Sequence, residues 1–473
     1  MSESGVTTRI HAYTDDVLGD HDATGVAELI RTRQISAEEA VDAAIARSGV
    51  VEPRLTALEH PDFDRARDRA RSGRAGGLAG VPSLFKDNVL VGGLPMTEGS
   101  HAMPLRPQTG DGKVVRQILD TGVIPIGTSR MPEFGWIPTT ERADGSVVHN
   151  PWNPAYSAGG SSGGSAAYVA AGVVPIAHGN DGGGSIRIPA AACGLVGLKP
   201  TRGRLLLGES AAAMPVRIVS DGVLTRTVRD TALFYAEAEE TYQNKHLPPV
   251  GHVDRPLDRP LRIGVMYDSP FAPATDDETR TAVEQLAHTL EGLGHHVEPY
   301  DPKVPASFRQ DFIDYWCLLA MSVRDSGKRM FGKDFDASSL EPITRGLASF
   351  GRSHLWRAPI YLPRLAASGR QYERAFGDVD LVLSPVLSHT TPRLGYLDPG
   401  LPWEECFSRV LDYCGFTPLH NATGAPSISL PTGQTRDGRP VGTMLSARRG
   451  ADALLLEAAL QIEQAVPFAR IAA

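Results

Sequence analysis

Two short segments rich in glycine and serine have the composition of a nucleophilic site. Residues 159–165 read GGSSGGS and residues 181–185 read DGGGS. Glycine allows positive φ angles and close approach of the backbone to a ligand, and bare peptide N–H groups can stabilise a developing negative charge. A flexible linker has a similar composition, but the run between the segments, residues 166–177, is apolar enough to be buried. We therefore predict two facing pockets built from backbone, in which serine hydroxyls supply the chemistry.

Ser185 is the candidate nucleophile because it follows three glycines and precedes a run of apolar residues that could hold it rigidly in place. A serine hydroxyl needs a base to become nucleophilic. Histidine is the usual base, but His149, His178 and His420 lie in no triad-like motif. A lone histidine is more often structural, so the sequence gives no support for a Ser–His pair.

Lys86 offers the other known arrangement, in which a lysine activates a serine. It lies in an apolar segment, residues 80–91, that we expect to form a buried strand. At a strand end the lysine would extend its amine to solvent, whereas a buried amine would lose proton affinity and could act as a base. The hydrophobic periodicity of this segment does not decide whether the Lys86 amine is exposed or buried. In the second case, Ser161 could pass a proton between Lys86 and Ser185.

Composition excludes several classes of protein. The chain has 473 residues, a formal charge of −8 and no run of basic residues, so direct nucleic-acid binding is not expected. No stretch of 18 apolar residues and no signal peptide are visible, which favours a cytoplasmic protein without a membrane span. The cysteines fit no common metal site, so we expect reduced thiols and no metal; they are Cys193, Cys317, Cys406 and Cys414.

Helical and strand patterns alternate along the chain, which predicts an α/β fold with parallel pairing. A capping box at Ser36–Glu39 begins one helix, and strands are expected at 123–127, 261–265 and 380–385. We find no repeat or linker and predict a single domain over 1–473, with a core at about 80–235. Residues 303–377 are predicted to be a helical insertion whose aromatic side chains are mostly core, with a minority lining a substrate pocket.

The candidate residues and their surroundings resemble the amidase signature family. Lys86 lies in GVPSLFKDN, Ser161 in GGSSGGS and Ser185 in GNDGGGSIRIPA, and the 75- and 24-residue separations between them fit the family pattern. The resemblance extends to PEFG at 132–135, NPW at 150–152, CGLVGLKPTRGR at 193–204 and segments near the C-terminus. It covers most of the chain, with residues 240–380 less well matched.

The resemblance implies an acyl-enzyme mechanism with Ser185 as the acylated nucleophile. Ser161, carried on a cis peptide bond, would be the middle residue of the relay, and Lys86 would be the neutral base. It also implies a large mixed β-sheet flanked by helices on both faces, and no metal or organic cofactor. The implied oxyanion hole consists of the backbone N–H groups of Gly182, Gly183, Gly184 and Ser185. Many family members carry a bulkier residue at the position of Gly182. Glycine should keep the backbone N–H donor at this position but hold it less rigidly.

The expected activity is hydrolysis of a carboxylic amide to a carboxylate and ammonia or an amine, with a small-molecule amide as the binding partner. The alternatives within the family are the glutamine-hydrolysing A subunit of a tRNA-dependent amidotransferase and a hydrolase of oligoamides or carbamates. Two further alternatives are a thiol amidase acting through Cys193 and a non-catalytic binding protein.

The sequence does not determine which amide is the substrate. We expect pocket residues from 128–137 and from the 303–377 insertion, and the aromatics of the insertion favour an apolar or aromatic amide. A homodimer is the expected assembly.

Overall fold

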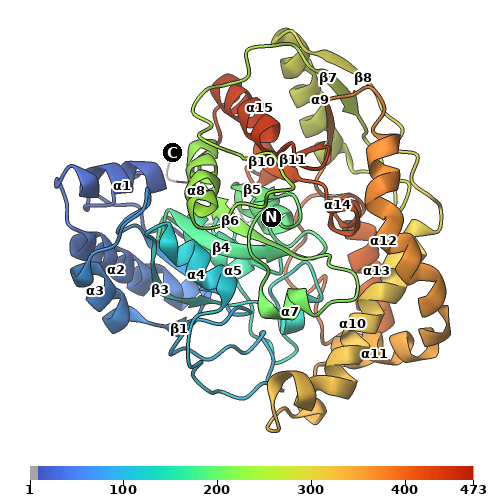
Figure 1. The fold of residues 1–473 in the computed structure, drawn as a ribbon, viewed down its shortest axis with the longest axis horizontal. Coiled ribbons are helices and arrows are strands. Elements are labelled where there is room, and N and C mark those ends of the chain that lie inside the picture. Colours follow the sequence, from blue (N-terminus) through green and yellow to red (C-terminus); the bar gives the residue numbers. More distant parts are fainter. Residues whose placement is uncertain (1–8, 472–473) are drawn as a thin grey trace, which may run out of the picture.

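The computed structural model describes residues 9–471 of the chain (Figure 1). Within these residues, a large sheet of eight strands has the order β4-β6-β5-β10-β11-β9-β7-β8. The pairs from β4 to β9 are antiparallel, whereas β7 pairs in parallel with both β9 and β8. The strands are β4 (Ile176–Asp181), β5 (Val196–Lys199), β6 (Ser220–Thr225), β7 (Arg262–Val265), β8 (His296–Pro299), β9 (Leu381–Pro385), β10 (Ser427–Gln434) and β11 (Pro440–Ala447). The predicted parallel pairing is therefore found at one end of a mixed sheet.

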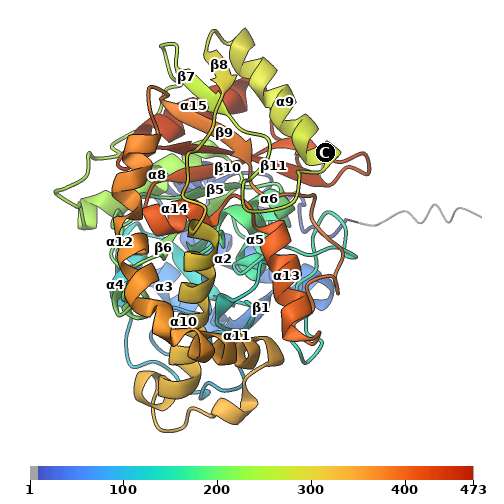
Figure 2. The ribbon, with the colours of Figure 1, turned by 90° about the vertical axis from the view of Figure 1, so that its right-hand side faces the viewer.

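Helices cover both faces of the large sheet, as the resemblance implies. Helices α8 and α15 contact each other on one face, and α5 and α6 contact each other on the opposite face (Figure 2). The helices up to α9 are α1 (Ala23–Arg31), α2 (Ala37–Leu55), α3 (Phe63–Ser72), α4 (Lys113–Asp120), α5 (Gly163–Ala170), α6 (Arg187–Cys193), α7 (Glu209–Ala212), α8 (Val228–Thr241) and α9 (Asp277–Gly292). The predicted capping box is present at α2, where the Glu39 N–H donates to Ser36 Oγ at 3.1 Å.

A smaller sheet of three strands, in the order β1-β3-β2, carries Lys86 at the end of its edge strand. Its strands are β1 (Leu58–Pro61), β2 (Pro82–Lys86) and β3 (Ile124–Ser129), and β2 runs parallel to β3. The strand predicted over residues 80–91 is therefore too long. The chain turns directly after Lys86, where the Asn88 N–H donates to the Lys86 carbonyl oxygen at 2.8 Å. Val89 and Val91, which follow, are buried, but in irregular structure.

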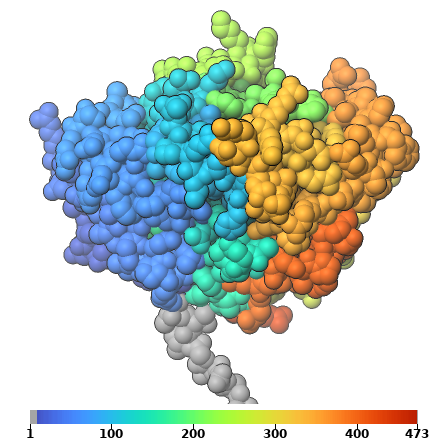
Figure 3. Space-filling view, turned by 90° about the horizontal axis from the view of Figure 1, so that it is seen from below, coloured from blue at the N-terminus to red at the C-terminus, as the bar shows by residue number. Residues whose placement is uncertain are grey.

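Three long helices occupy most of the segment predicted to be a helical insertion. The helices from α10 onwards are α10 (Phe308–Phe331), α11 (Pro342–Ser353), α12 (Ala358–Ala375), α13 (Trp403–Tyr413), α14 (Pro418–Thr423) and α15 (Asp452–Ala465). In Figure 3 the surface of the helical segment, in orange, lies against the surface of residues near 100, in cyan. The Asp336 N–H, beyond the end of α10, donates to the Ala102 carbonyl oxygen at 3.0 Å. Across residues 9–471, no helix has the length and apolar character needed to cross a bilayer.

Candidate active site

Lys86 and Ser161 are hydrogen-bonded to each other in the interior of the protein. The Lys86 Nζ donates to Ser161 Oγ at 2.7 Å and to Asn180 Oδ1 at 2.8 Å. The two side chains are almost fully buried, with 1% and 2% of each residue exposed. Lys86 ends β2, Ser161 lies two residues before α5 and Asn180 lies in β4, so three separate elements meet at the amine.

Burial makes Lys86 a usable base near neutral pH. Loss of solvation lowers the pKa of its amine to about 7, against the opposing influence of Glu98, Asp181 and Asp221. A primary amine with this pKa is partly uncharged at neutral pH and can accept a proton from a hydroxyl at hydrogen-bonding distance. The structure therefore answers the question that the strand periodicity left open, because the amine of Lys86 is buried and does not reach solvent.

The Gly160–Ser161 peptide bond is cis, as the resemblance implies. Glycine is required before Ser161, since a Cβ atom on Gly160 would lie 2.6 Å from the backbone nitrogen of Thr139. The backbone of Gly135 also approaches closely, and a Cβ there would lie 2.8 Å from Ser161 Oγ. These contacts leave Ser161 little room and direct its hydroxyl towards the Lys86 amine.

A buried ion pair holds the turn that carries Ser185. This turn connects β4 to α6, and the Asp181 carboxylate at its start accepts hydrogen bonds from the Gly184 N–H at 2.7 Å and the Ile186 N–H at 3.1 Å. The Arg187 guanidinium donates to both Asp181 oxygens at 2.8 and 2.9 Å. Burial alone would raise the pKa of Asp181, but Arg187 holds it well below its usual range. The carboxylate therefore stays charged and fixes the turn.

This clamp requires a correction to the predicted oxyanion hole. The Gly184 N–H already donates to Asp181, so it is not a free donor for a substrate oxygen. Within residues 9–471, the N–H groups of Gly182, Gly183 and Ser185 make no hydrogen bond. Gly184 contributes its conformation instead: its φ angle is 138°, and a Cβ atom would lie 2.5 Å from Thr417 Oγ1. The candidate oxyanion donors are therefore three instead of four.

The Ser185 hydroxyl does not complete the relay in this structure. It makes no hydrogen bond to any of residues 9–471, so the predicted link between Ser161 and Ser185 is not formed. Ser185 is the most exposed of the three candidates, at 8%, and it lines a pocket together with Gly135, the glycine that lies against Ser161 Oγ. Ser161 is not among the lining residues, so of the two serines only Ser185 borders this pocket.

The pocket in front of Ser185 is apolar and aromatic, and its lining contains no charged side chain. Trp316 of α10 contacts Trp136 edge to face, with ring centroids 5.5 Å apart, and stacks on Phe312 at 5.9 Å. The pocket thus draws on both segments predicted to supply it. It also draws on α13, which the sequence did not indicate. The lining residues are Gly135, Trp136, Ile137, Pro138, Gly183, Ser185, Ile188, Phe312, Ile313, Trp316, Phe407, Val410, Leu411, Cys414 and Pro418.

The alternative bases and nucleophiles do not fit the geometry. His178 Nε2 lies 3.2 Å from Asp221 Oδ1, and its Nδ1 accepts the backbone N–H of Lys86 at 3.2 Å. His420 contacts Arg187, and His149 contacts the carbonyl oxygen of Pro154. Cys193 is fully buried, and burial strongly raises the pKa of its thiol. A thiol amidase acting through Cys193 is therefore not supported, because only the thiolate is nucleophilic.

Asn180 is a site residue that the sequence analysis missed. Its amide oxygen accepts from the Lys86 amine and directs the amine towards Ser161. We expect Asn180→Ala to lower kcat/KM about 10- to 100-fold, because small displacements of a catalytic group cost this much. The measurement is amide hydrolysis at constant pH with the melting temperature in parallel. Asn244→Ala is the control, since the side-chain hydrogen bonds of Asn244 go to Gly203 and His246 and not to the candidate site residues. Unchanged kcat/KM in Asn180→Ala would remove Asn180 from the site.

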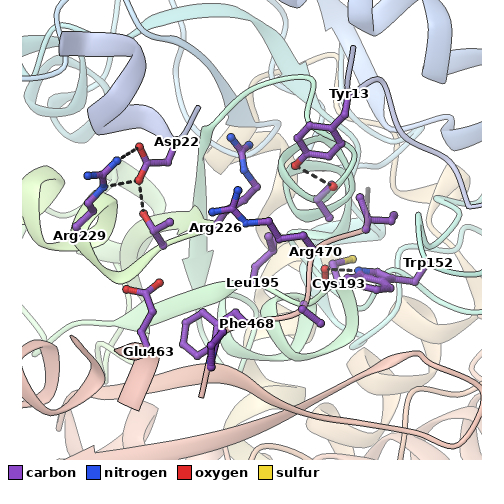
Figure 4. A pocket seen from close by; sticks show the side chains of 16 residues that line it. Tyr13, Asp22, Trp152, Cys193, Leu195, Arg226, Arg229, Glu463, Phe468 and Arg470 are labelled. Atoms are coloured by element: carbon purple, nitrogen blue, oxygen red, sulfur yellow. Dashed lines mark hydrogen bonds and ion pairs between the residues drawn. The ribbon is translucent and has the colours of Figure 1, made fainter. Parts of the chain in front are cut away.

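A second, larger cavity of about 350 Å³ lies between the two ends of the described chain (Figure 4). None of Lys86, Ser161 and Ser185 is among its lining residues. Its charged groups are already engaged: Asp22 pairs with Arg229 at 2.5 Å, and Arg226 donates to backbone carbonyl oxygens. Because Lys86, Ser161 and Ser185 lie outside this cavity, their chemistry belongs to the pocket at Ser185.

Comparisons with known proteins identify the family to which the chain is related. The model of the Amidase family matches residues 39–456. The protein named "Putative amidase AmiC" of Mycobacterium tuberculosis is 48% identical over 98% of this chain and 98% of its own length. Among solved structures, 6-aminohexanoate cyclic dimer hydrolase complexed with substrate has a TM-score of 0.86 at 30% identity, covering 97% of this chain and 98% of its own. A bacterial aryl acylamidase has a TM-score of 0.83 at 27% identity, covering 95% and 96%.

Proposed function

The chain belongs to the amidase signature family, and we propose that it hydrolyses a carboxylic amide through an acyl-enzyme on Ser185. The observation that carries the proposal is the 2.7 Å hydrogen bond between the buried Lys86 amine and Ser161, next to the pocket that Ser185 lines. The relatives support amide hydrolysis as the reaction class. The roles of the individual residues rest on the geometry and on the chemistry below.

In the first half-reaction, the neutral Lys86 amine takes the proton of Ser161 as Ser161 takes the proton of Ser185. The Ser185 oxygen then attacks the amide carbon. The resulting oxyanion accepts hydrogen bonds from the N–H groups of Gly182, Gly183 and Ser185. This step requires the Ser185 hydroxyl to turn towards Ser161 when substrate binds, and catalytic hydrogen bonds often tighten only in the complex.

Acylation is completed by the same relay in reverse, and the second half-reaction then hydrolyses the acyl-enzyme. The proton held by Lys86 returns through Ser161 to the leaving nitrogen, the C–N bond breaks, and ammonia or an amine departs. Water then gives a proton to the relay and attacks the acyl carbon. The C–O bond to Ser185 breaks, Ser185 recovers its proton, and the carboxylate is released.

The acyl group of the substrate is proposed to be apolar or aromatic. A charged group would lose its hydration in a pocket without a compensating charge, which is costly, whereas an apolar group gains from leaving water. Trp136, Phe312 and Trp316 offer ring faces and edges against which an aromatic acyl group can pack. This substrate class agrees with the aromatic helical segment that the sequence indicated.

A release assay over a panel of amides tests the proposed function. The panel contains benzamide, phenylacetamide, hexanamide, acetamide, 6-aminohexanamide, 6-aminohexanoate cyclic dimer and glutamine, each assayed for ammonia or carboxylate. The proposal expects the highest kcat/KM with the aromatic and long apolar amides. A clear preference for glutamine would favour the amidotransferase subunit, and a preference for the cyclic dimer would favour an oligoamide hydrolase. No hydrolysis of any amide would contradict the proposal.

Trp316→Ala should separate aromatic from small substrates. We expect kcat/KM for phenylacetamide to fall about 10- to 100-fold, because a lost aromatic contact of this size costs on the order of 1–3 kcal/mol. The value for acetamide should change much less. The matched control is Trp356→Ala, in the same helical segment, because Trp356 is 71% exposed and lies outside the pocket. An equal loss for both amides would mean that Trp316 supports the fold and does not contact the substrate.

A further inference from the structure

Thr417 is a fully buried threonine whose side chain is bonded to the turn that carries Ser185. Its hydroxyl oxygen, Oγ1, donates to the Gly183 carbonyl oxygen at 2.6 Å, although the two residues lie 234 positions apart in the sequence. Thr417 directly precedes helix α14. The relay of Lys86, Ser161 and Ser185 does not use this hydroxyl, so its contact with the turn points to a different role.

The peptide bond between Gly183 and Gly184 is held at both ends. Its carbonyl oxygen accepts from Thr417, and its N–H donates to the Asp181 carboxylate at 2.7 Å. Two of the three candidate oxyanion donors, the N–H groups of Gly183 and Ser185, belong to the peptide bonds on either side of it. The orientation of this one peptide therefore helps to set the directions of both donors.

This peptide needs an external restraint because a glycine stands on each side of it. Without side chains, Gly183 and Gly184 permit rotations of the peptide plane that other residues resist. Gly183 also lines the substrate pocket, so a carbonyl oxygen released from Thr417 could turn towards the space in which the substrate oxyanion forms. The partial negative charge of a carbonyl oxygen there would oppose the donors that stabilise the oxyanion.

Thr417 is itself anchored to the ion pair of the turn. Its carbonyl oxygen accepts from Arg187 Nη1 at 3.0 Å, and Arg187 also binds both carboxylate oxygens of Asp181. Four residues after Thr417, the Asn421 amide donates to the Asp181 carbonyl oxygen at 2.8 Å. Residues four apart lie on one face of a helix, so the start of α14 docks on the turn through a single face.

The contact between Thr417 and the turn is close. A Cβ atom on Gly184 would lie 2.5 Å from Thr417 Oγ1. Cys414 and Pro418, which lie on either side of Thr417 in the sequence, line the substrate pocket, whereas Thr417 is not among the lining residues. Thr417 therefore connects the wall of the pocket to the oxyanion turn without bordering the substrate itself.

We propose that Thr417 is a positioning residue for the oxyanion hole, whose hydroxyl keeps the Gly183 carbonyl oxygen away from the substrate and the neighbouring N–H donors directed towards it. This role rests on the proposed function, because it concerns the oxyanion of the same reaction. The contribution of Thr417 should be larger in the transition state, in which the substrate oxygen carries negative charge, than in the substrate complex, in which that oxygen belongs to a neutral amide.

The experiment compares two inhibitors of matched shape in wild type and in Thr417→Val, which keeps the shape of the side chain but lacks the hydroxyl. The first inhibitor is a phenylalkyl trifluoromethyl ketone. The Ser185 oxygen bonds to its carbonyl carbon, the Ser185 proton passes through Ser161 to Lys86, and the ketone oxygen becomes an oxyanion. The second inhibitor is the corresponding trifluoromethyl alcohol, which fills the pocket but forms no adduct.

The hydroxyl of Thr417 should matter for the ketone alone. We expect the Ki of the ketone to rise about 10- to 100-fold in Thr417→Val, because misdirected donors lose part of their stabilisation of the oxyanion. The Ki of the alcohol should change by less than about twofold. The kcat/KM for phenylacetamide should fall by about the same factor as the affinity for the ketone. Thr417→Ser, which keeps a hydroxyl, should recover most of the ketone affinity.

Thr121→Val is the matched control. Thr121 is also fully buried, and its hydroxyl donates to the Ile118 carbonyl oxygen at 2.7 Å, at the end of α4. Each valine variant loses one buried hydrogen bond, so their melting temperatures should fall by similar amounts, but Thr121→Val should keep the wild-type Ki for the ketone. Thr417→Ala also lacks the hydroxyl and takes the place of Thr417→Val if the valine variant does not fold.

The possible outcomes are distinct. An unchanged Ki for the ketone in a folded variant without the Thr417 hydroxyl would overturn the role of Thr417. An equal rise in Ki for ketone and alcohol would overturn it too, because the hydroxyl would then support the pocket and not the oxyanion donors. The same would follow from an equal rise in Thr121→Val. If wild type neither forms the ketone adduct nor hydrolyses any amide, the proposed function itself is contradicted, and the inference falls with it.

Discussion

Ser185→Ala is expected to lower amide turnover by about 100,000-fold or more and to abolish labelling by a fluorophosphonate. Removal of a serine nucleophile costs this much because the oxyanion donors and the binding pocket alone retain only a small rate enhancement. The three free N–H groups at the Ser185 turn would remain in the variant, so weak substrate binding should persist. The measurements are ammonia release over hours and gel detection of the label.

The control for this variant is Ser210→Ala, an exposed serine in α7. It should keep wild-type turnover and labelling. Equal melting temperatures of the two variants would show that loss of activity does not come from unfolding, since the Ser185 hydroxyl makes no hydrogen bond to any of residues 9–471. Labelling of Ser185→Ala at the wild-type rate would assign the nucleophile to another residue.

Lys86→Met is expected to reduce kcat/KM by about 1,000-fold or more, because the variant keeps the length of the side chain but lacks the base. General-base contributions of 100- to 10,000-fold are typical, and this amine is the group that accepts the serine proton in the proposed relay. Lys86→Ala should lose at least as much activity and some stability, because it leaves a cavity in a fully buried strand. Turnover of the best amide of the panel is the readout.

The stability of Lys86→Met provides a second test with a defined sign. Burial lowers the pKa of Lys86 from its ordinary value of 10.5 to about 7 in the folded protein, so the wild type loses stability as the pH falls from about 10 to about 7 and loses little more below that. A methionine carries no such penalty. The melting temperature of the variant should therefore fall less than that of wild type between pH 9 and pH 7. A parallel fall in the two proteins would mean that Lys86 is not buried as an uncharged amine.

The sequence was sufficient to identify the reactive residues, but not to predict which hydrogen bonds they form. The separations of Lys86, Ser161 and Ser185 matched a family pattern, and the structure brings Lys86 to Ser161. Burial of the lysine could not be derived from alternation, because every residue of β2 is buried. Lys199 illustrates the difficulty: it is also fully buried, with a pKa lowered to about 7, yet its Nζ bonds only to the Pro200 carbonyl oxygen.

The missed features fall into two groups with different physical causes. The bond from the Gly184 N–H to Asp181 spans three residues, and aspartate commonly accepts such local backbone donors, so the DGGGS sequence contained a signal for it. The contribution of α13 to the pocket joins residues more than 200 positions apart and has no local signal. The same holds for Asn180, whose role depends on which strands meet at the Lys86 amine.

The central claim is that Ser185 becomes acylated, and mass spectrometry of the wild-type protein tests it most directly. The enzyme is mixed with a slowly hydrolysed aromatic ester or amide, quenched in acid within the first turnovers, digested and mapped. The account predicts one acyl adduct, on the peptide containing Ser185, which forms and then decays as product appears. An adduct on another residue, or product formation with no adduct at any time point, would contradict it.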